Sequence, residues 1–437
     1  MEDKILEKLI EAEIKRQEET LGLIPSENLV SKDVLRALGS ELTNKYSEGY
    51  PGKRYYAGNS VIDKIELLAQ ERARKVFRLG KNWHVNVQPY SGSPANQAVY
   101  YALIKTRTNT EPTRTGTDSL PRKSALSQYK SDIMGMSLPF GGHLTHGWKV
   151  NFSARFYKAV QYEVGRDGLI DYDAVRKLAK KERPQIIVAG ATAYPRIFDF
   201  EKFGKIAHDV GAYFLADISH IAGLIAAGAH PSPFGSADVV TTTTHKTLRG
   251  PRGAIIFANS KSQIARKKGI DIVKEIDKAV FPGLQGGPHD HQTAAIAVAL
   301  GEAMNPSFKK YGHQVVKDAK ALARELIKRG FELVSGGTDN HLILIDLTNL
   351  GISGREAQDR LEESGVIANR NTIPFDTRSP FDPSGIRIGT PTLASRGMKE
   401  KEMEEVAEIM KEVLIGGKNM NQRVKKLCRK FPVPPHF

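Results

Sequence analysis

Lys246 is the residue whose setting in this sequence first suggests chemistry. It follows four consecutive threonines, Thr241 to Thr244, and a histidine, His245. Four β-branched residues favour a stiff strand, so Lys246 is expected just beyond the strand's end. A lysine that leaves a rigid strand into a closed site can lose its proton and attack an aldehyde. A single lysine in this position is more often solvated, so the signal is weak alone.

A second signal is Asp217, the last residue of the apolar run Tyr213 to Asp217. A carboxylate at the end of a buried strand costs free energy unless its charge is paired. One partner is a pyridinium nitrogen, which stays protonated beside a carboxylate and lets the ring act as an electron sink. The alternative is a structural aspartate that caps the turn. His220 follows three residues later.

A third signal is the segment Ser91-Gly92-Ser93, which precedes a helical run to Leu103. Ser93 can cap this helix, and Pro94 suits its first turn. A helix N-terminus favours phosphate because its free N–H groups face the ligand. A capped helix without a ligand is the alternative. The three signals occur in this order at successive strand ends: a phosphate-binding turn, a partner for a ring nitrogen and a lysine nucleophile. Together they indicate pyridoxal phosphate held as a Schiff base on Lys246.

A metal site is the main rival use of the histidines. His143 and His146 lie three residues apart, and His220 and His245 could join them. Zinc needs convergent ligands, and the sequence offers neither a cysteine set nor an HExxH pattern. No metal is therefore predicted, and an imidazole stacked on the cofactor ring is the better use of His143.

A buried sheet is needed to bring these residues to one edge. Nearly every residue of the candidate strands is apolar or β-branched, which predicts a mostly parallel sheet covered by helices on both faces. In such sheets, ligands bind at the carboxyl ends of the strands. The candidate strands are 85–88, 133–136, 185–189, 213–217, 239–244 and 254–257.

The predicted organisation has three parts. An N-terminal helical arm covers residues 1–30, a large cofactor-binding domain covers 31–300, and a small C-terminal α/β domain covers 301–437. The stretch 106–128 is rich in Thr, Arg, Ser and Pro, so it is expected to form a flexible surface insertion.

Composition narrows the class of protein. The 437 residues are 40% hydrophobic and carry a net charge of +15. Most Lys and Arg residues are interleaved with Glu, which favours a solvated basic surface over a nucleic-acid-binding protein. The single cysteine, Cys428, fits a reducing compartment. No signal peptide and no membrane-spanning run is evident, so a cytoplasmic enzyme without a membrane partner is expected.

Over nearly its whole length the sequence resembles the serine hydroxymethyltransferase family. The resemblance implies the aminotransferase-like pyridoxal-phosphate fold (fold type I), and a homodimer or, as the alternative, a tetramer, with active sites shared between subunits. The matching stretches are 26–28, 42–46, 48–56, 91–93, 141–147, 239–246, 281–288, 335–341 and 384–391.

The resemblance also implies a role for each cofactor residue. Lys246 forms the Schiff base, Asp217 pairs with the ring nitrogen, and His143 stacks on the ring. Thr192 lies near the phenolic oxygen, where the family commonly has Ser. The remaining cofactor contacts are the phosphate-binding Ser91, Gly92 and Ser93, the flanking His220 and His245, and Tyr46 and Gly287 from the neighbouring subunit.

The substrates follow from the same resemblance. Arg387 holds the serine carboxylate with help from Ser26, whereas Glu48 and Tyr56 reach the substrate from the partner subunit, with Glu48 as the acid. The one-carbon unit passes to a tetrahydropterin, and glycine remains. The implied pterin contacts are Leu138, Gly142, His143, Leu144, Tyr55, Asn371, Ser379, Pro380 and Phe381.

Two questions stay open at this point. Pro139 and Phe140 replace a usual His-containing approach to the pterin, and Leu284 interrupts a usually all-glycine turn. The carrier is therefore either tetrahydrofolate or, as in an archaeal-type enzyme, tetrahydromethanopterin. A threonine aldolase-like lyase has the same fold and cofactor but needs no pterin.

Overall fold

The computed structural model describes residues 1–104 and 129–434. The predicted insertion at 106–128 lies outside these described residues. Within them, no helix has the length and apolar character needed to cross a bilayer.

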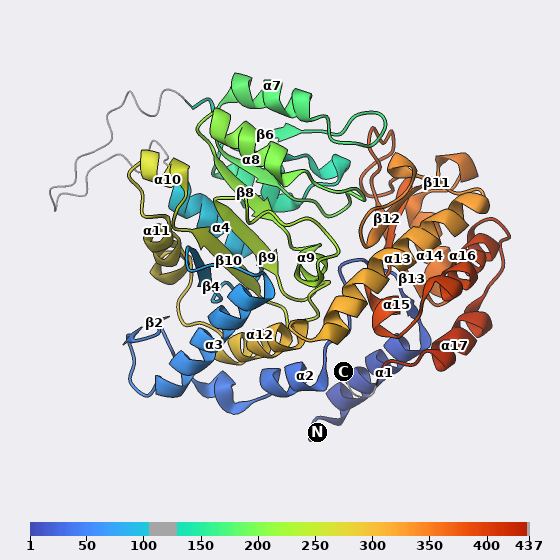
Figure 1. The fold of residues 1–437 in the computed structure, drawn as a ribbon. Coiled ribbons are helices and arrows are strands. Elements are labelled where there is room, and N and C mark those ends of the chain that lie inside the picture. Colours follow the sequence, from blue (N-terminus) through green and yellow to red (C-terminus); the bar gives the residue numbers. More distant parts are fainter. Residues whose placement is uncertain (105–128, 435–437) are drawn as a thin grey trace.

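A seven-stranded sheet forms the centre of the larger part of the molecule (Figure 1). Its order is β4-β10-β9-β8-β7-β5-β6, and only β10 runs antiparallel to its neighbours. All six predicted strands are present, with ends shifted by up to two residues. The strand bounds are β4 Trp83–Asn86, β5 Ser131–Met136, β6 Ala159–Tyr162, β7 Pro184–Ala189, β8 Tyr213–Asp217, β9 Val239–Thr243 and β10 Ala254–Asn259.

Both faces of this sheet are covered by helices, as the apolar strands predicted. In β7, Ile186 and Val188 belong to one apolar core, while Ile187 and Ala189 belong to the core on the opposite face. Successive side chains of a strand point to opposite faces, so a doubly covered strand is apolar throughout. The covering helices include α3 Ser60–Val76, α4 Gly92–Leu103, α7 Tyr172–Glu182, α8 Phe200–Asp209, α9 Ala222–Ala227, α11 Ile272–Lys278 and α12 Asp290–Ala303.

A second core surrounds a four-stranded sheet of order β11-β12-β15-β14. Helix α13, Pro306–Lys328, joins the two cores, because Phe308 and Tyr311 pack in the first and Leu322 and Leu326 in the second. The strands are β11 Glu332–Leu333, β12 Leu342–Asp346, β14 Asn369–Asn371 and β15 Gly385–Gly389; the helices include α14 Gly354–Glu363, α15 Pro391–Ser395, α16 Glu400–Leu414 and α17 Asn421–Lys430.

The N-terminal segment runs along the second core. Helix α1, Lys4–Glu19, lies beside α17, and β1, Leu21–Gly22, pairs with β13, Val366–Ile367 (Figure 1). Leu21 is fully buried in the second core, whereas α1 has no buried residue. An apolar stripe along this first helix is therefore exposed in the single chain. It consists of Ile5, Leu6, Leu9, Ile10 and Ile14.

At the N-terminus of α3, the local sequence pattern and the structure differ. Ser60 and Asp63 resemble a capping pair, but Asn59 occupies the N-cap position. Asp63 instead accepts hydrogen bonds from Arg54 Nε at 2.8 Å and Gly52 N at 2.9 Å. The buried Arg54 side chain requires this partner, so a long-range charge overrides the local pattern.

Candidate active site

A pocket of about 210 Å³ lies at the carboxyl ends of β7, β8 and β9, beside the N-terminus of α4. It brings together nine of the predicted site residues from five separate stretches of the chain. Its lining is Ser91, Gly92, Ser93, His143, His146, Ala191, Thr192, Asp217, Ser219, His220, Thr243, His245, Lys246 and Arg252.

The N-terminus of α4 opens toward this pocket. Its N-cap is Ser91, whose side chain makes no capping hydrogen bond, so the expectation that Ser93 caps the helix is wrong. The N–H groups of Gly92 and Ser93 lie in the first turn, where no intrahelical acceptor is available. A Cβ atom on Gly92 would lie 2.7 Å from Thr243 Cγ2, so only glycine fits this close approach to β9. The arrangement suits a phosphate group.

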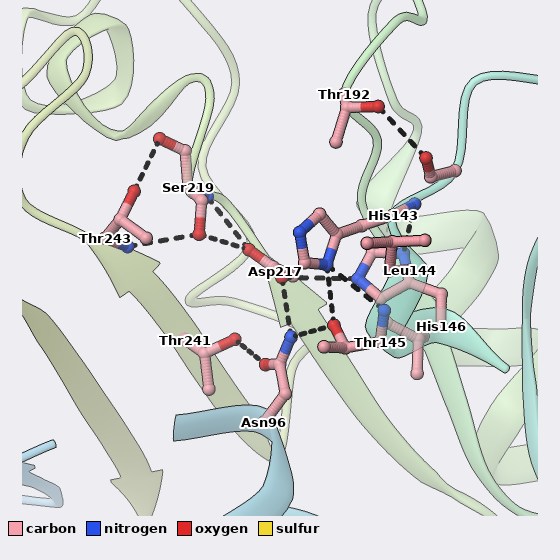
Figure 2. A network of polar contacts seen from close by, with 12 residues as sticks. Asn96, His143, Leu144, Thr145, His146, Thr192, Asp217, Ser219, Thr241 and Thr243 are labelled. Carbon is pink, nitrogen blue, oxygen red and sulfur yellow. Dashed lines mark hydrogen bonds and ion pairs between the residues drawn. The ribbon is translucent and has the colours of Figure 1, made fainter. Parts of the chain in front are cut away.

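Asp217 is the centre of a polar network (Figure 2). Its Oδ2 accepts hydrogen bonds from Asn96 Nδ2 at 2.8 Å and His146 Nε2 at 3.2 Å. Its Oδ1 accepts from Ser219 Oγ at 2.6 Å. Burial opposes the charge, but these donors outweigh it and hold the pKa of Asp217 well below its usual range. A buried carboxylate fixed in this way is a suitable partner for a protonated ring nitrogen.

His143 is held by the same network. Thr145 accepts from Asn96 Nδ2 at 2.9 Å, and its Oγ1 lies 2.8 Å from His143 Nδ1 (Figure 2). Burial lowers the pKa of His143 to about 4, so the ring is neutral at physiological pH. An oriented, neutral imidazole can stack on an aromatic cofactor.

Sequence reasoning missed Asn96 and assigned no cofactor role to His146. The available signals were weak: Asn96 follows the phosphate-seat turn, and His146 stood only as a possible metal ligand. Both are buried, and their hydrogen bonds to Asp217 span 121 and 71 residues of sequence.

Lys246 follows β9, and only 9% of the residue is exposed. Burial lowers the pKa of its amine to about 8, and the positive charges of Arg387 and Arg252 act in the same direction while Asp217 opposes them. A neutral amine is accessible near this pKa, which is the state that attacks an aldehyde. The Lys246 carbonyl accepts from Asn28 Nδ2 at 3.0 Å, so the backbone is fixed.

Two further histidines flank Lys246, as expected. His245 has a buried Nδ1 without a hydrogen-bond partner in the described residues, and burial lowers its pKa to about 3. His220 Nδ1 lies 3.2 Å from His341 Nε2.

Arg387, on β15, borders the pocket through Thr192. Its Nη1 donates to the Thr192 carbonyl at 2.6 Å, and Nε and Nη2 donate to Asn369 Oδ1 at 3.2 and 3.1 Å. No carboxylate pairs with Arg387 within residues 1–104 and 129–434, and burial lowers its pKa to about 10. A partly buried guanidinium without an anion is suited to bind a substrate carboxylate. The Thr192 hydroxyl itself donates to the Gly142 carbonyl at 3.0 Å.

Ser26 lies in an adjoining pocket of about 330 Å³, which shares His245 and Arg252 with the first. The single chain therefore places Ser26 next to the Lys246 pocket but not in its lining.

Five other predicted residues form a separate cluster. Tyr46 Oη donates to Glu48 Oε1 at 3.4 Å, and its ring packs edge-on against Tyr56 at 5.2 Å. Tyr55 contacts Tyr56, and Gly287 lies against the Tyr46 ring. None of these residues lines the Lys246 pocket.

The predicted pterin residues lie in three places. Loop 138–144 meets the segment that begins at Asn371, since Thr372 Oγ1 donates to the Pro139 carbonyl at 3.4 Å and the rings of Phe140 and Phe375 are 5.0 Å apart. Gly142 is required, because a Cβ there would lie 1.9 Å from the Met136 carbonyl oxygen. Leu138, Leu144, Ser379, Pro380 and Phe381 are partly or fully exposed, while Tyr55 belongs to the tyrosine cluster.

The donor set fits pyridoxal phosphate, since one pocket holds an open helix N-terminus, a buried carboxylate and a lysine of lowered pKa. Within the described residues, no group of three or more His, Cys, Asp or Glu side chains is arranged to hold a metal ion.

Comparison with known proteins agrees with this geometry. The sequence model of the family described as "Serine hydroxymethyltransferase" matches residues 1–112 and 108–410. The chain is 51% identical to the serine hydroxymethyltransferase of Acidothermus cellulolyticus, covering 99% of this chain and 96% of that protein. It is 51% identical to that of Desulfotalea psychrophila, covering 98% and 93%, and 52% identical to that of Sorangium cellulosum, covering 99% and 95%. The chain belongs to the serine hydroxymethyltransferase family.

Proposed function

We propose that this enzyme reversibly transfers the hydroxymethyl carbon of serine to a folate-type tetrahydropterin and leaves glycine. The observation that carries the proposal is the convergence of Asp217, Lys246 and the α4 N-terminus on one pocket. Family membership makes the protein a pyridoxal-phosphate-dependent transferase of fold type I. The cofactor, when bound, supplies an electron sink for the negative charge that develops at the amino-acid α-carbon.

Each pocket residue has a role in holding the cofactor. Ser91, Gly92 and Ser93 bind the phosphate at the α4 N-terminus, and Asp217 keeps the ring nitrogen protonated. His143 stacks on the ring in its neutral form. Thr192 and His220 lie on the side of the pocket toward the second core, and His245 lies beside the lysine. Lys246 Nζ binds the cofactor aldehyde and carries protons when it is displaced.

Substrate binding is assigned to a second set of residues. Arg387 holds the carboxylate by its fork of N–H donors, with Ser26 from the adjoining pocket. Glu48 is the acid at the hydroxymethyl oxygen, and Tyr56 orients it. The pterin lies against loop 138–144, Asn371 and the exposed 379–381 turn, with Tyr55.

Glu48 and the tyrosines reach Lys246 of the neighbouring subunit in a homodimer with shared sites. Two such dimers could assemble into a tetramer. Two features support this proposal: the Tyr46–Glu48 cluster lies outside the pocket, and α1 exposes an apolar stripe. The two apolar cores support a division at about residue 300 between a large and a small domain, with 1–30 as an arm. A cytoplasmic location also stays a proposal, based on the single cysteine.

The comparisons support neither an aldolase-like lyase nor a nucleic-acid-binding protein. Tetrahydrofolate is the proposed carrier, and tetrahydromethanopterin is the alternative.

The test is the visible absorption spectrum of the purified protein with glycine, before and after each pterin is added separately. A cofactor band that moves to longer wavelength with one pterin is expected and names the carrier. A band indifferent to both pterins would favour the lyase. Lys246→Ala should fold and bind glycine yet lose nearly all turnover, and near-normal turnover by it would refute the assignment.

A further inference from the structure

A buried pair of histidines connects the pocket to the second core. His220 follows β8 of the seven-stranded sheet, and His341 directly precedes β12 of the four-stranded sheet. His220 Nδ1 lies 3.2 Å from His341 Nε2, and the two ring centroids are 5.4 Å apart. His220 is 5% exposed and His341 is fully buried. His341 is the last residue of the stretch 335–341 that resembles the family.

Both rings are neutral at physiological pH. Burial is the largest cause, and the charges of Lys246 and Arg387 add to it; the pKa of His341 falls to about 3 and that of His220 lies well below its ordinary value. Two neutral imidazoles in contact place one proton between them, so one ring donates and the other accepts.

The environment of His341 Nδ1 decides which ring donates. This nitrogen is buried and has no hydrogen-bond partner in the part of the chain that the structure describes. A buried N–H without an acceptor is rarer than a buried acceptor without a donor. Nδ1 of His341 is therefore unprotonated. The ring carries its proton on Nε2, which donates to His220 Nδ1.

The consequence for the pocket follows from the tautomer of His220. Because His220 Nδ1 accepts, the neutral ring carries its proton on Nε2. His220 lines the Lys246 pocket, and no hydrogen bond within the described residues involves its Nε2. The Nε2–H is free to donate to an acceptor in the pocket.

We propose that His341 is a positioning residue that fixes the orientation and tautomer of His220, so that His220 presents an N–H donor to a ligand oxygen beside Lys246. The tautomer is a property of the chain alone, whereas the use of this donor to bind the cofactor rests on the proposed function.

The first test is ¹⁵N NMR of the unliganded protein labelled at histidine, with the two rings assigned through His341→Gln and His220→Asn. Both rings should be Nε2–H tautomers. A proton on Nδ1 of His220, or a charged ring at pH 7, would overturn the proposal whether or not the cofactor binds.

The second test is the dissociation constant of pyridoxal phosphate for apoenzyme variants. His341→Leu removes the donor and should weaken binding about tenfold, the effect of one buried hydrogen bond, and should shift the cofactor absorption maximum. His341→Gln retains a donor near the Nε2 position and should restore binding to within about threefold. His313→Leu, an exposed control on α13, should change nothing.

These outcomes separate the two proposals. An unchanged constant and spectrum in His341→Leu would overturn the positioning role. Failure of the wild-type protein to bind pyridoxal phosphate would instead refute the proposed function, and the NMR result would still decide the tautomer.

Discussion

Lys246 and Arg387 are cations that the protein has taken out of water. Burial is the largest cause of the lowered pKa at both residues, yet the consequences differ. Lys246 comes within reach of neutrality at physiological pH, which suits its proposed role as a nucleophile. Arg387 remains charged, because even a lowered guanidinium pKa of about 10 lies far above neutral pH. The same physical effect therefore yields a reactive amine at one position and a permanent anion site at the other.

Replacement of Arg387 tests the second role. Arg387→Ala should weaken serine binding by about 2–5 kcal/mol, the usual effect of removing one partner of a buried charge pair. Arg387→Lys should recover only part of this loss, since an ammonium cannot form the two-pronged contact with a carboxylate. The check is a titration of the cofactor spectrum with serine and glycine.

Arg370→Ala serves as the control, because Arg370 lies on the same strand pair, opposite Ile386 rather than Arg387. Equal losses in Arg370→Ala and Arg387→Ala would mean that general disturbance of the small sheet explains the effect.

At the scale of elements, the close approach of α4 to β9 shapes the proposed phosphate-binding turn. Gly92→Ala places a methyl group 2.7 Å from Thr243 Cγ2, so the helix start must move. We expect at least tenfold weaker binding of pyridoxal phosphate and a loss of about 1–3 kcal/mol in the free energy of unfolding. Gly235→Ala is the matched control, because no atom lies within 4 Å of its added Cβ. Identical cofactor affinities in the two variants would contradict the assigned seat.

Helix α13 carries a buried acid that makes stability depend on pH. Asp318 is fully buried; its Oδ1 accepts from Gln314 Nε2 at 2.7 Å, and its Oδ2 has no partner in the described residues. Burial, followed by the charges of Glu400 and Glu402, raises its pKa to about 8. The folded state thus binds a proton that the unfolded state has released above its own pKa of about 4.

The free energy of unfolding should therefore decrease as pH rises from about 4 to 8, by at most about 1.4 kcal/mol per pH unit from this group. Asp318→Asn keeps the hydrogen-bond acceptor and removes the titrating group. The free energy of unfolding of the variant should therefore exceed that of the wild type at pH 8 but not at pH 4. Denaturant unfolding at several pH values measures this. Glu201→Gln, an exposed change on α8, should leave the slope unchanged; an unchanged slope in Asp318→Asn would refute the argument.

At the scale of the whole molecule, the single chain keeps apart two groups of residues that we propose to form one site. The pocket contains Lys246, and the Tyr46–Glu48 cluster lies elsewhere, next to Gly286 and Gly287. Helices α1, α2 (Lys32–Leu38) and α3 lie along one edge of the molecule (Figure 1). Each carries exposed apolar side chains, among them Leu35 on α2. A symmetric dimer through this edge would cover them.

Mixed dimers test whether the two halves combine between subunits. Lys246→Ala and Glu48→Gln should each be nearly inactive. After the two are unfolded together and refolded, random pairing gives mixed dimers with one intact site each, so activity should return to about one quarter of wild type. Absence of recovery, with dimers present by sedimentation, would place Glu48 and Lys246 of one site in the same chain.

Local patterns were sufficient to predict several features of this protein. The six strands were predictable because burial on both faces makes each strand apolar throughout. The meeting of Ser91, Asp217 and Lys246 in one pocket was predictable because parallel strands end at one edge of the sheet; their roles at a cofactor stay predictions. Strand β6 was missed because three of its four residues are only partly buried and one of them is Gln161, so it lacks that pattern.

Tertiary structure alone decided the contacts between distant segments. It showed Ser91 rather than Ser93 at the helix cap, His146 and Asn96 on Asp217, Arg387 on the Thr192 carbonyl, and His341 against His220. The Arg387 and His341 contacts span 195 and 121 residues. Sequence determines a residue's chemistry and its local backbone preference, whereas the pKa, tautomer and partner of a buried group depend on neighbours that only packing brings within hydrogen-bond distance.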